Sequence, residues 1–206
     1  MEKPGKLTVK MRNDMRRVIQ ATLKESARIK IAVARDKVDT VQAIAESIIV
    51  CYRTGGKVLF CGNGGSAADA QHLAAELMGR FKLNRQPLSA IALTTNTSIL
   101  TAVANDYGYE HVFSRQVEAL ATERDVIISI STSGNSPNVI EAINMAKQRG
   151  AKTIALTGKG GGTLAEVADL ALIIPSDNTA IIQEAHIAIG HIICELVERA
   201  LFSGDS

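Results

Sequence analysis

The stretch CGNGGSAADAQHLAAEL, Cys61 to Leu77, follows the short apolar run KVLF and leads into a helical pattern. A strand, a glycine-rich turn and a helix in this order form the basic unit of an α/β fold. The turn also satisfies the dinucleotide fingerprint G-x-G-x-x-G/A through Gly62, Gly64 and Ala67. That fingerprint requires an acidic residue about 20 positions further on, at the end of the next strand, to hold the ribose. Here the next apolar run ends in ALTTNTS, which has no carboxylate, so the sequence argues against a nicotinamide cofactor.

The same unit repeats along the chain. Five strands with intervening helices predict an α/β fold with a doubly wound, five-stranded parallel sheet, flavodoxin-like or Rossmann-like. We expect a single domain over residues 1–206, in which 1–54 form N-terminal helices and 55–206 form the α/β core. The apolar runs that predict strands are 57–61, 88–94, 126–131, 153–157 and 170–175, and the helical patterns between and after them are 66–81, 97–104, 137–148, 163–168 and 179–201.

Composition restricts the class of protein. The chain has 206 residues, of which 46% are apolar and 21% charged, which is enough for one domain with a substantial core. Aromatic residues make up only 3% and Trp is absent, so the core must consist of Ala, Ile, Leu and Val. That composition is typical of helices packed on a buried parallel sheet.

Charge and cysteine usage bear on partners and compartment. The net charge of +2 gives no indication of a nucleic-acid or membrane partner. The basic segment 1–30 lacks the apolar region of a signal peptide and is interpreted as a solvated helix face, and no apolar stretch approaches the roughly 20 residues that span a bilayer. We therefore expect a soluble cytoplasmic protein without nucleic-acid or membrane partners. The three cysteines lack metal-like spacing and are expected to be reduced core thiols: Cys51, Cys61 and Cys194.

Hydroxyl groups gather after the predicted strand at 126–131. The segment STSGNSPN, Ser131 to Asn138, enters a helix at Pro137. Side-chain hydroxyls, together with backbone N–H groups around Gly134 at a helix N-terminus, form a neutral cradle for a phosphate dianion. The alternative is that these residues only cap the helix, for which one serine would suffice. The sequence favours phosphate binding by Ser131, Thr132, Ser133 and Ser136.

Three of the four histidines lie on two predicted helices. His72 and Glu76 are spaced i, i+4, so both side chains project from one face of the helix after the glycine-rich turn. This spacing suits a metal pair or a base with its orienting partner, although a lone pair of this kind is most often a surface contact. The C-terminal helix adds Gln183, Glu184, His186 and His191.

Five stretches together resemble bacterial phosphoheptose isomerases of the sugar-isomerase (SIS) superfamily. They are GGKVLFCGNGGSAADAQHLAAEL, VANDYGYEHVFSRQVEAL, ISTSGNSPNVIEAI, ALTGKGGG and IIQEAHIAIGHIICELVE, and they occur in order from about residue 40 onward. The resemblance implies a sugar-phosphate-binding SIS core and a ketose–aldose isomerisation of sedoheptulose 7-phosphate to D-glycero-D-manno-heptose 7-phosphate. The product would serve as a precursor of lipopolysaccharide or another surface heptose.

The resemblance also implies roles for individual residues. Glu76 and His191 match the proton-transfer pair, and zinc, one ion per subunit, would be held by His72, Glu76, Gln183 and His191. One departure is Ile181, because the residue two before the glutamine is commonly basic in this family, which puts a contact at the substrate or subunit boundary in doubt. The positions that match substrate contacts are Asn63, Gly64, Gly65, Glu76, Asn105, Asp106, Ser131, Thr132, Ser133, Ser136 and Gln183.

Alternatives stay open at this level. A carboxylate bound to a metal is a poorer base, so the ion is catalytic, structural or incidental. A non-catalytic regulator similar to the DnaA initiator-associating protein, or a sensor or isomerase for another sugar phosphate, would share much of the pattern.

Helical spacing predicts that sites are shared between chains. Gln183 and His191 are eight residues apart, which means about 12 Å of rise and roughly 80° of rotation on one helix. Metal–ligand bonds are only about 2 Å long, so we expect the two groups at one ion to come from different chains. The resemblance implies a homotetramer.

Overall fold

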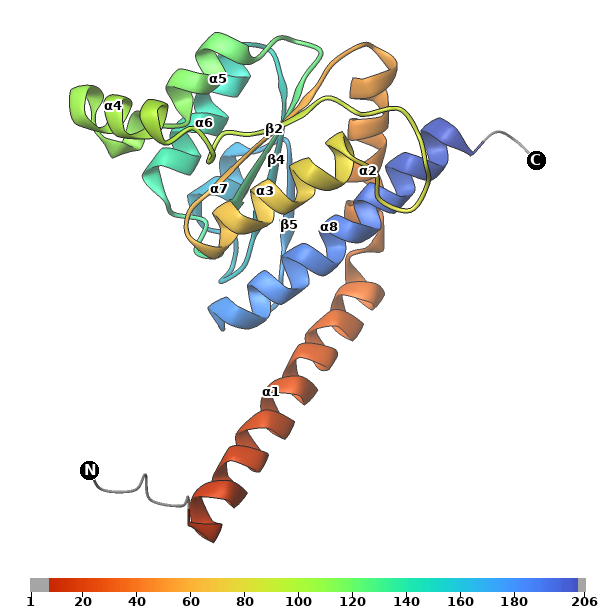
Figure 1. Cartoon of the computed structure of the whole chain (residues 1–206), viewed down its shortest axis with the longest axis vertical. Coiled ribbons are helices and arrows are strands. Elements are labelled where there is room, and N and C mark those ends of the chain that lie inside the picture. Colours follow the sequence, from red (N-terminus) through yellow and green to blue (C-terminus); the bar gives the residue numbers. More distant parts are fainter. Residues whose placement is uncertain (1–7, 204–206) are drawn as a thin grey trace, which may run out of the picture.

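Five parallel strands form one sheet at the centre of the structure (Figure 1). The computed structural model describes residues 8–203. The strands are β1 (Val58–Gly62), β2 (Ala90–Ala92), β3 (Val126–Ser131), β4 (Lys152–Thr157) and β5 (Leu170–Ile173). Their order, β2-β1-β3-β4-β5, is that of the flavodoxin-like doubly wound sheet, so the expected α/β fold is confirmed.

The strands alternate between two hydrophobic cores because successive side chains point to opposite faces of a sheet. Val58 and Phe60 of β1 lie in one core, whereas Leu59 and Cys61 lie in the other. Both faces are covered, so β1 and β3 are buried throughout and mostly apolar, and the polar residues of β3, Ser129 and Ser131, are buried as well.

Helices cover the two faces unequally. One core lies under α1 (Val9–Asp36), α2 (Val38–Arg53), α3 (Gly65–Met78) and α8 (Thr179–Phe202). The other lies under α5 (Ser114–Leu120), α6 (Pro137–Gln148) and α7 (Gly162–Val167). The helix α4 (Thr97–Tyr107) and the 3-10 turn η1 (Tyr109–His111) have no fully buried residue and lie at the outside of the molecule (Figure 1).

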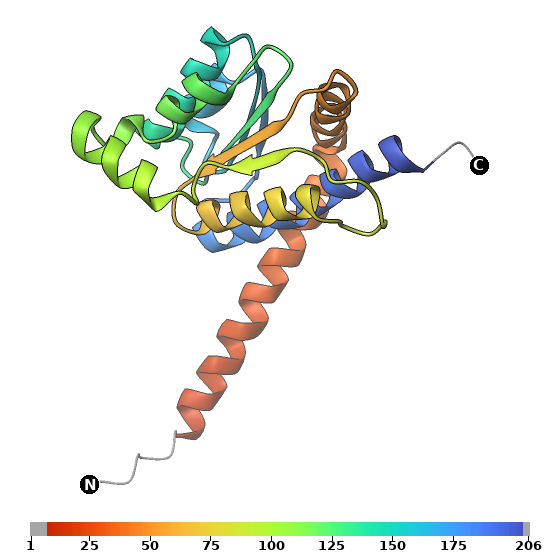
Figure 2. The same ribbon diagram turned by 45° about the horizontal axis from the view of Figure 1, so that its top comes forward.

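The long helix α1 projects away from the rest of the chain in both views (Figures 1 and 2). Only its last part is packed, and its buried residues are Ser26, Ile29 and Val33. Ser26 Oγ donates to the Glu184 carboxylate on α8, which fixes the point where α1 leaves the body. The expected N-terminal helical extension is therefore present.

The boundaries of the predicted strands and helices lie close to those of the structure, but two features of the structure were not expected. The short helix α5 and the turn η1 were not predicted. In addition, α8 is long and apolar enough to cross a membrane by length and composition, where no such stretch was expected. Half of that apolar window is buried in the chain, since α8 is a core helix beside α2 and α3.

Candidate active site

Two loops meet at the carboxyl edge of the sheet, where the strand order reverses. The loop after β1 carries Asn63, and the loop after the neighbouring β3 leads to Asn138. The two side-chain amides exchange a pair of hydrogen bonds, each 2.9 Å, and the hydroxyl of Tyr109 donates to Asn63 Oδ1 at 3.2 Å. Ligands of doubly wound sheets bind at this switch point, so the fold itself forms the crevice.

Three serine hydroxyls converge in the second loop. Ser131 Oγ lies 3.1 Å from Ser136 Oγ and 3.4 Å from Ser133 Oγ. Ser136 is the N-cap residue of α6, yet its side chain makes no capping hydrogen bond. Thr132 lies between them, half-buried. The Ser133 hydroxyl also accepts a hydrogen bond from Asn135 N at 3.2 Å. The three hydroxyls therefore gather at the N-terminus of α6, where backbone N–H groups and the helix dipole favour an anion.

This cradle is supported from behind by a second glycine-rich loop. Gly134 has φ +67°, and a Cβ there would collide with the carbonyl of Gly161. Leu164 N donates to Gly134 O at 2.8 Å, and Thr163 N donates to Asn135 Oδ1 at 3.0 Å. Only glycine permits this close approach of two backbones.

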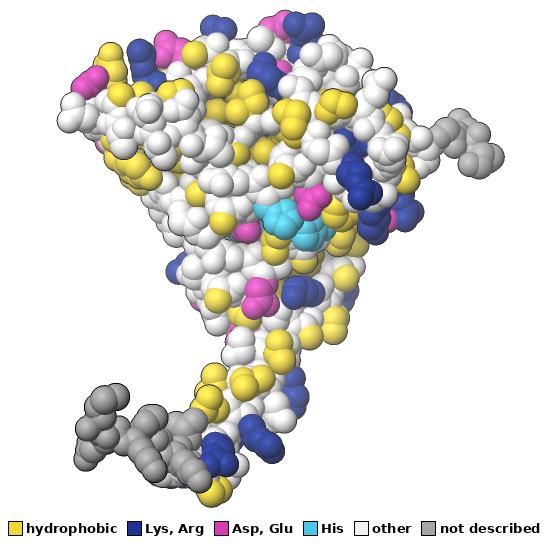
Figure 3. Space-filling model, in the orientation of Figure 1, with side chains coloured by type: hydrophobic (Ala, Val, Ile, Leu, Met, Phe, Trp, Pro, Cys, Tyr) yellow, Lys and Arg dark blue, Asp and Glu magenta, His cyan; other side chains and the backbone are white. Residues whose placement is uncertain are grey.

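The predicted pair on α3 meets the predicted histidine on α8. His72 Nε2 lies 3.0 Å from Glu76 Oε1 and 3.0 Å from His191 Nε2. Figure 3 shows histidine side chains together on the surface, beside an acidic group. One ligand atom each of His72, Glu76 and His191 lies within 4.8 Å of the other two. Within residues 8–203, these three side chains form a group that could hold a metal ion.

Gln183 lies elsewhere in the same chain. Its amide packs over Gly65 at the start of α3, where a Cβ would collide with it. His72 is seven residues further along α3, about 10 Å of helical rise. One chain thus brings His72, Glu76 and His191 together and leaves Gln183 beside the first loop, next to Gly64 and Gly65.

Three further positions lie apart from these groups. Asn105 and Asp106 are exposed on α4, where Asn105 Nδ2 donates to Asp106 Oδ1 at 2.8 Å. No hydrogen bond within residues 8–203 joins either of them to the other candidate residues. Ile181, the departure from the family pattern, is 1% exposed and lies in the core.

Several neighbours of the site were not predicted. Asn138 and Tyr109 orient Asn63, as described above. Asp69 precedes His72 by one turn of α3, and burial, partly offset by His72, raises its pKa to about 6. Its Oδ2 is buried without a hydrogen-bond partner. The sequence did contain a signal for Asp69: it precedes His72 by three residues and Glu76 by seven, which places all three on one face of a helix.

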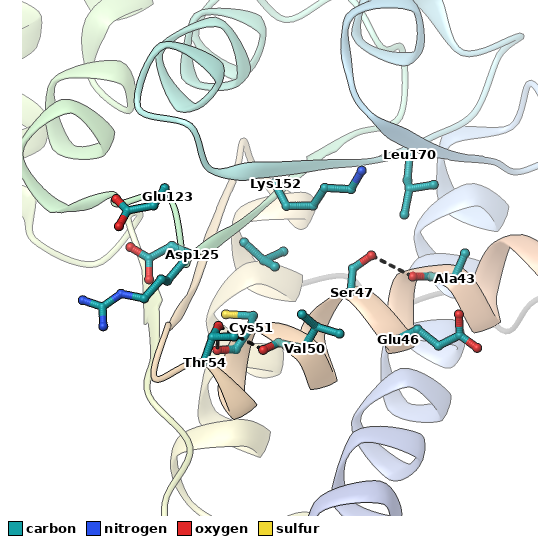
Figure 4. Close-up of a pocket in the computed structure, with 12 residues that line it drawn as sticks. Ala43, Glu46, Ser47, Val50, Cys51, Thr54, Glu123, Asp125, Lys152 and Leu170 are labelled. Atoms are coloured by element: carbon teal, nitrogen blue, oxygen red, sulfur yellow. Dashed lines mark hydrogen bonds between the residues drawn. The ribbon is translucent and has the colours of Figure 1, made fainter.

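The described part of the chain also has hollows outside this site, two of which are large. An apolar groove of about 500 Å³ runs between α8 and the junction of α1 and α2. Another, of about 610 Å³, lies at the amino edge of the sheet, opposite the site (Figure 4). There Asp125 pairs with Lys57 at 2.7 Å, and Lys152 lies 3.9 Å from Asp169, so these two charged residues of its lining already have partners of opposite charge.

Comparison with known proteins gives a consistent picture. Residues 23–158 match the family model described as SIS domain. The phosphoheptose isomerase of Rhodospirillum rubrum is 58% identical over 168 residues, covering 80% of this chain and 89% of that protein. That of Citrifermentans bemidjiense is 54% identical over 184 residues, covering 89% and 96%. The solved structure of phosphoheptose isomerase from Neisseria gonorrhoeae superimposes with a TM-score of 0.85 at 46% identity, covering 89% of this chain and 98% of that one.

Proposed function

The chain belongs to the SIS-domain family and, within it, to the phosphoheptose isomerases, and we infer that it interconverts sedoheptulose 7-phosphate and D-glycero-D-manno-heptose 7-phosphate. The observation that supports this most strongly is the meeting of Glu76 and His191 from two different helices. An aldose–ketose isomerase needs a carboxylate base and a proton donor side by side.

We propose that Glu76 moves the carbon-bound proton. Its carboxylate takes a proton from C1 of the ketose, and the C–H electron pair forms the C1=C2 bond of a cis-enediol. His191 gives a proton to O2 as the C2=O bond opens. Glu76 then returns its proton to C2, and His191 takes the proton of O1 as the aldehyde forms. Each residue ends the cycle in its starting protonation state.

The serine loop is proposed to bind the other end of the sugar. Ser131, Thr132, Ser133 and Ser136 supply hydroxyls, and the N-terminus of α6 supplies backbone N–H groups. A heptose 7-phosphate carries its phosphate at the end opposite C1 and C2. A phosphate cradle set apart from the proton-transfer pair is what such a substrate requires. Further substrate contacts are proposed for Asn63, Gly64, Gly65, Asn105, Asp106 and Gln183.

The side chains at the pair also fit a zinc ion. Two imidazole nitrogens and one carboxylate oxygen are ligands that zinc prefers, and a three-ligand set leaves a position open. We propose that His72, Glu76 and His191 of one chain hold this ion and that Gln183 of a neighbouring chain completes the set. A ring nitrogen or carboxylate oxygen bound to the ion cannot carry the transferred proton, so the proton steps described above belong to Glu76 and His191 when they are not ligands. When bound, zinc would polarise the oxygens of the substrate.

We propose that copies of this chain assemble as a tetramer and share sites. The projecting part of α1 exposes apolar side chains at helical spacing, among them Met11, Met15 and Val18. The apolar groove beside α8 is lined by Val33, Val38, Val41, Ile189 and Ile192. Uncovered apolar surfaces of this kind mark protein contacts, and a second copy supplies a matching stripe and groove. The three buried free thiols suit a reducing, cytoplasmic compartment.

Turnover distinguishes this function from its alternatives. Purified protein is incubated with sedoheptulose 7-phosphate, and in parallel with a five-carbon ketose phosphate, and the aldose products are measured. We expect conversion of the heptulose phosphate with a clear preference over the shorter sugar. Binding of both sugars without conversion would instead indicate a regulator or sensor, and preference for the pentulose would indicate a different isomerase.

A further inference from the structure

A buried carboxylate on α8 organises the segment that follows α3. Glu198 is 1% exposed and accepts hydrogen bonds from the backbone N–H groups of Phe81, Lys82 and Leu83, at 3.0, 2.8 and 3.0 Å. Arg85 Nε donates to the same carboxylate at 2.9 Å, and its side chain is 2% exposed. Burial by itself would raise the pKa of Glu198, but these donors outweigh it and lower that pKa. We call this group the Glu198 anchor.

The anchor also holds the end of α3, the helix that carries the base. Arg85 Nη2 donates to the backbone carbonyl of Glu76 at 3.0 Å, and Nη1 donates to that of Leu77 at 2.8 Å. Because an arginine has five donors in a rigid fork, it can join a carboxylate on one helix to carbonyls on another. The two helices that carry Glu76 and His191 are thus tied together one step behind the site.

One aromatic ring links the anchor to His191. The backbone of Phe81 is fixed by Glu198, and its ring stacks on the His191 imidazole with centroids 5.5 Å apart and planes 18° apart. His191 and Glu198 are seven residues apart on α8, so they lie on nearly the same face of the helix, and Phe81 contacts both of them. The Nε2 edge of the His191 ring meets His72: the two Nε2 atoms are 3.0 Å apart, and the ring planes are tilted by 57° with centroids 4.9 Å apart.

We propose that Phe81 is a positioning residue for His191: its ring, held by the Glu198 anchor, keeps the imidazole turned toward Glu76 and His72. An imidazole that is stacked on Phe81 and has its Nε2 edge against His72 has little freedom to rotate. Proton transfer and metal binding both depend on the direction of one ring nitrogen, so both depend on this stack. Phe81 itself exchanges no proton with the substrate.

The test separates orientation from general packing. In Phe81→Leu, which keeps an apolar side chain but no ring, we expect kcat to fall about tenfold while KM changes by less than about twofold. Zinc titrated into the metal-free protein should bind about tenfold more weakly. Phe81→Tyr keeps a flat ring and should retain both properties within about twofold. Phe81→Met is a second ring-free variant should Phe81→Leu fail to fold.

Leu83→Ala is the matched control, because Leu83 lies in the same segment, is 36% exposed and makes its anchor contact through the backbone. We expect it to leave kcat and zinc affinity unchanged. Unchanged kcat and zinc affinity in the folded ring-free variants, or an equal loss in Leu83→Ala, would overturn the inference. The inference about Phe81 rests on the proposed function, but separate results contradict each of them. A parent protein without turnover contradicts the proposed function, whereas the zinc titration tests the role of Phe81 directly.

Discussion

Glu76 combines three contacts that define its role at the scale of the residue. Its carboxylate faces His72, its backbone carbonyl is held by Arg85, and its ligand atom lies within 4.8 Å of that of His191. Helical spacing alone related Glu76 to His72. The approach of His191 to His72 joins positions 119 residues apart in sequence. No local spacing predicts it: the family resemblance implied it, and the folded chain shows the contact.

Replacing Glu76 by Gln should abolish chemistry while leaving the phosphate cradle intact. The amide keeps the size of the side chain but cannot accept the carbon-bound proton. We expect turnover of sedoheptulose 7-phosphate to fall by roughly 10²-fold or more, with inorganic phosphate still competing for binding. Steady-state assays of the folded variant check this, and near-normal turnover would remove Glu76 from the proposed role.

The serine loop gives a second prediction at this scale. Ser133→Ala and Ser136→Ala should each weaken sugar-phosphate binding by about 1–3 kcal/mol, because each removes a hydrogen bond to a charged group. Ser47→Ala is the control, since Ser47 Oγ bonds only the Ala43 carbonyl on α2, at 2.8 Å. Calorimetric titration measures the affinities. If all three variants bind as the parent does, the loop is no phosphate site.

Among the helices, α8 carries a buried histidine, His186, whose burial makes the free energy of unfolding depend on pH. His186 is fully buried, its Nε2 lies 3.0 Å from the Thr157 carbonyl, and its Nδ1 has no partner. Burial, partly offset by that hydrogen bond, lowers its pKa to about 4. As the pH falls, His186 is therefore protonated near pH 6.5 in the unfolded chain but only near pH 4 in the folded chain.

Stability should consequently fall as the pH drops through this window. At fixed protein concentration, the contribution of His186 to the free energy of unfolding is complete above pH 6.5 and declines by about 3 kcal/mol toward pH 4. His186→Gln cannot take up a proton, so its unfolding free energy should lose less over the same range. Urea unfolding at several pH values measures both slopes, and equal slopes would contradict a neutral buried His186.

Elements with clear sequence signals at both ends could be predicted, whereas contacts between distant segments could not. The strands were predicted within about two residues because glycine-rich turns or helical patterns bound each apolar run. The edge strand β2 was predicted longer than it is, since it pairs only with β1 and its ladder covers three residues. The role of Glu198 could not be predicted from the apolar pattern of α8. Its partners, Arg85 and the backbone of residues 81–83, belong to a segment that is distant in sequence.

In the assembled protein, the proposed sharing of sites predicts which mutant chains restore each other's activity. One site is proposed to take His72, Glu76 and His191 from one chain and Gln183 from its neighbour. Inactive Gln183→Ala and His191→Ala proteins, dissociated, mixed and reassembled, should regain part of the activity, since some hybrid sites are complete.

A mixture of Glu76→Gln and His191→Ala is the matched control and should stay inactive, because no single chain then holds both groups. Native mass spectrometry confirms that hybrids form. Recovery in the control would place Glu76 and His191 of one site on different chains. Hybrids that stay inactive in both mixtures would place Gln183 in the same chain as His191, and a Gln183→Ala protein that is active by itself would place Gln183 outside the site.

The central claim is that this chain moves a proton between adjacent carbons of a heptose phosphate. The most direct measurement is turnover of sedoheptulose 7-phosphate by the assembled protein in D₂O, with the product analysed by NMR. An enediol route, with Glu76 exchanging its proton with solvent, predicts D-glycero-D-manno-heptose 7-phosphate that carries deuterium at C2 and has lost the corresponding proton signal. Absence of the aldose product would contradict the function. Product without any deuterium at C2, even at slow turnover, would contradict proton transfer by a half-buried carboxylate that exchanges its proton with solvent.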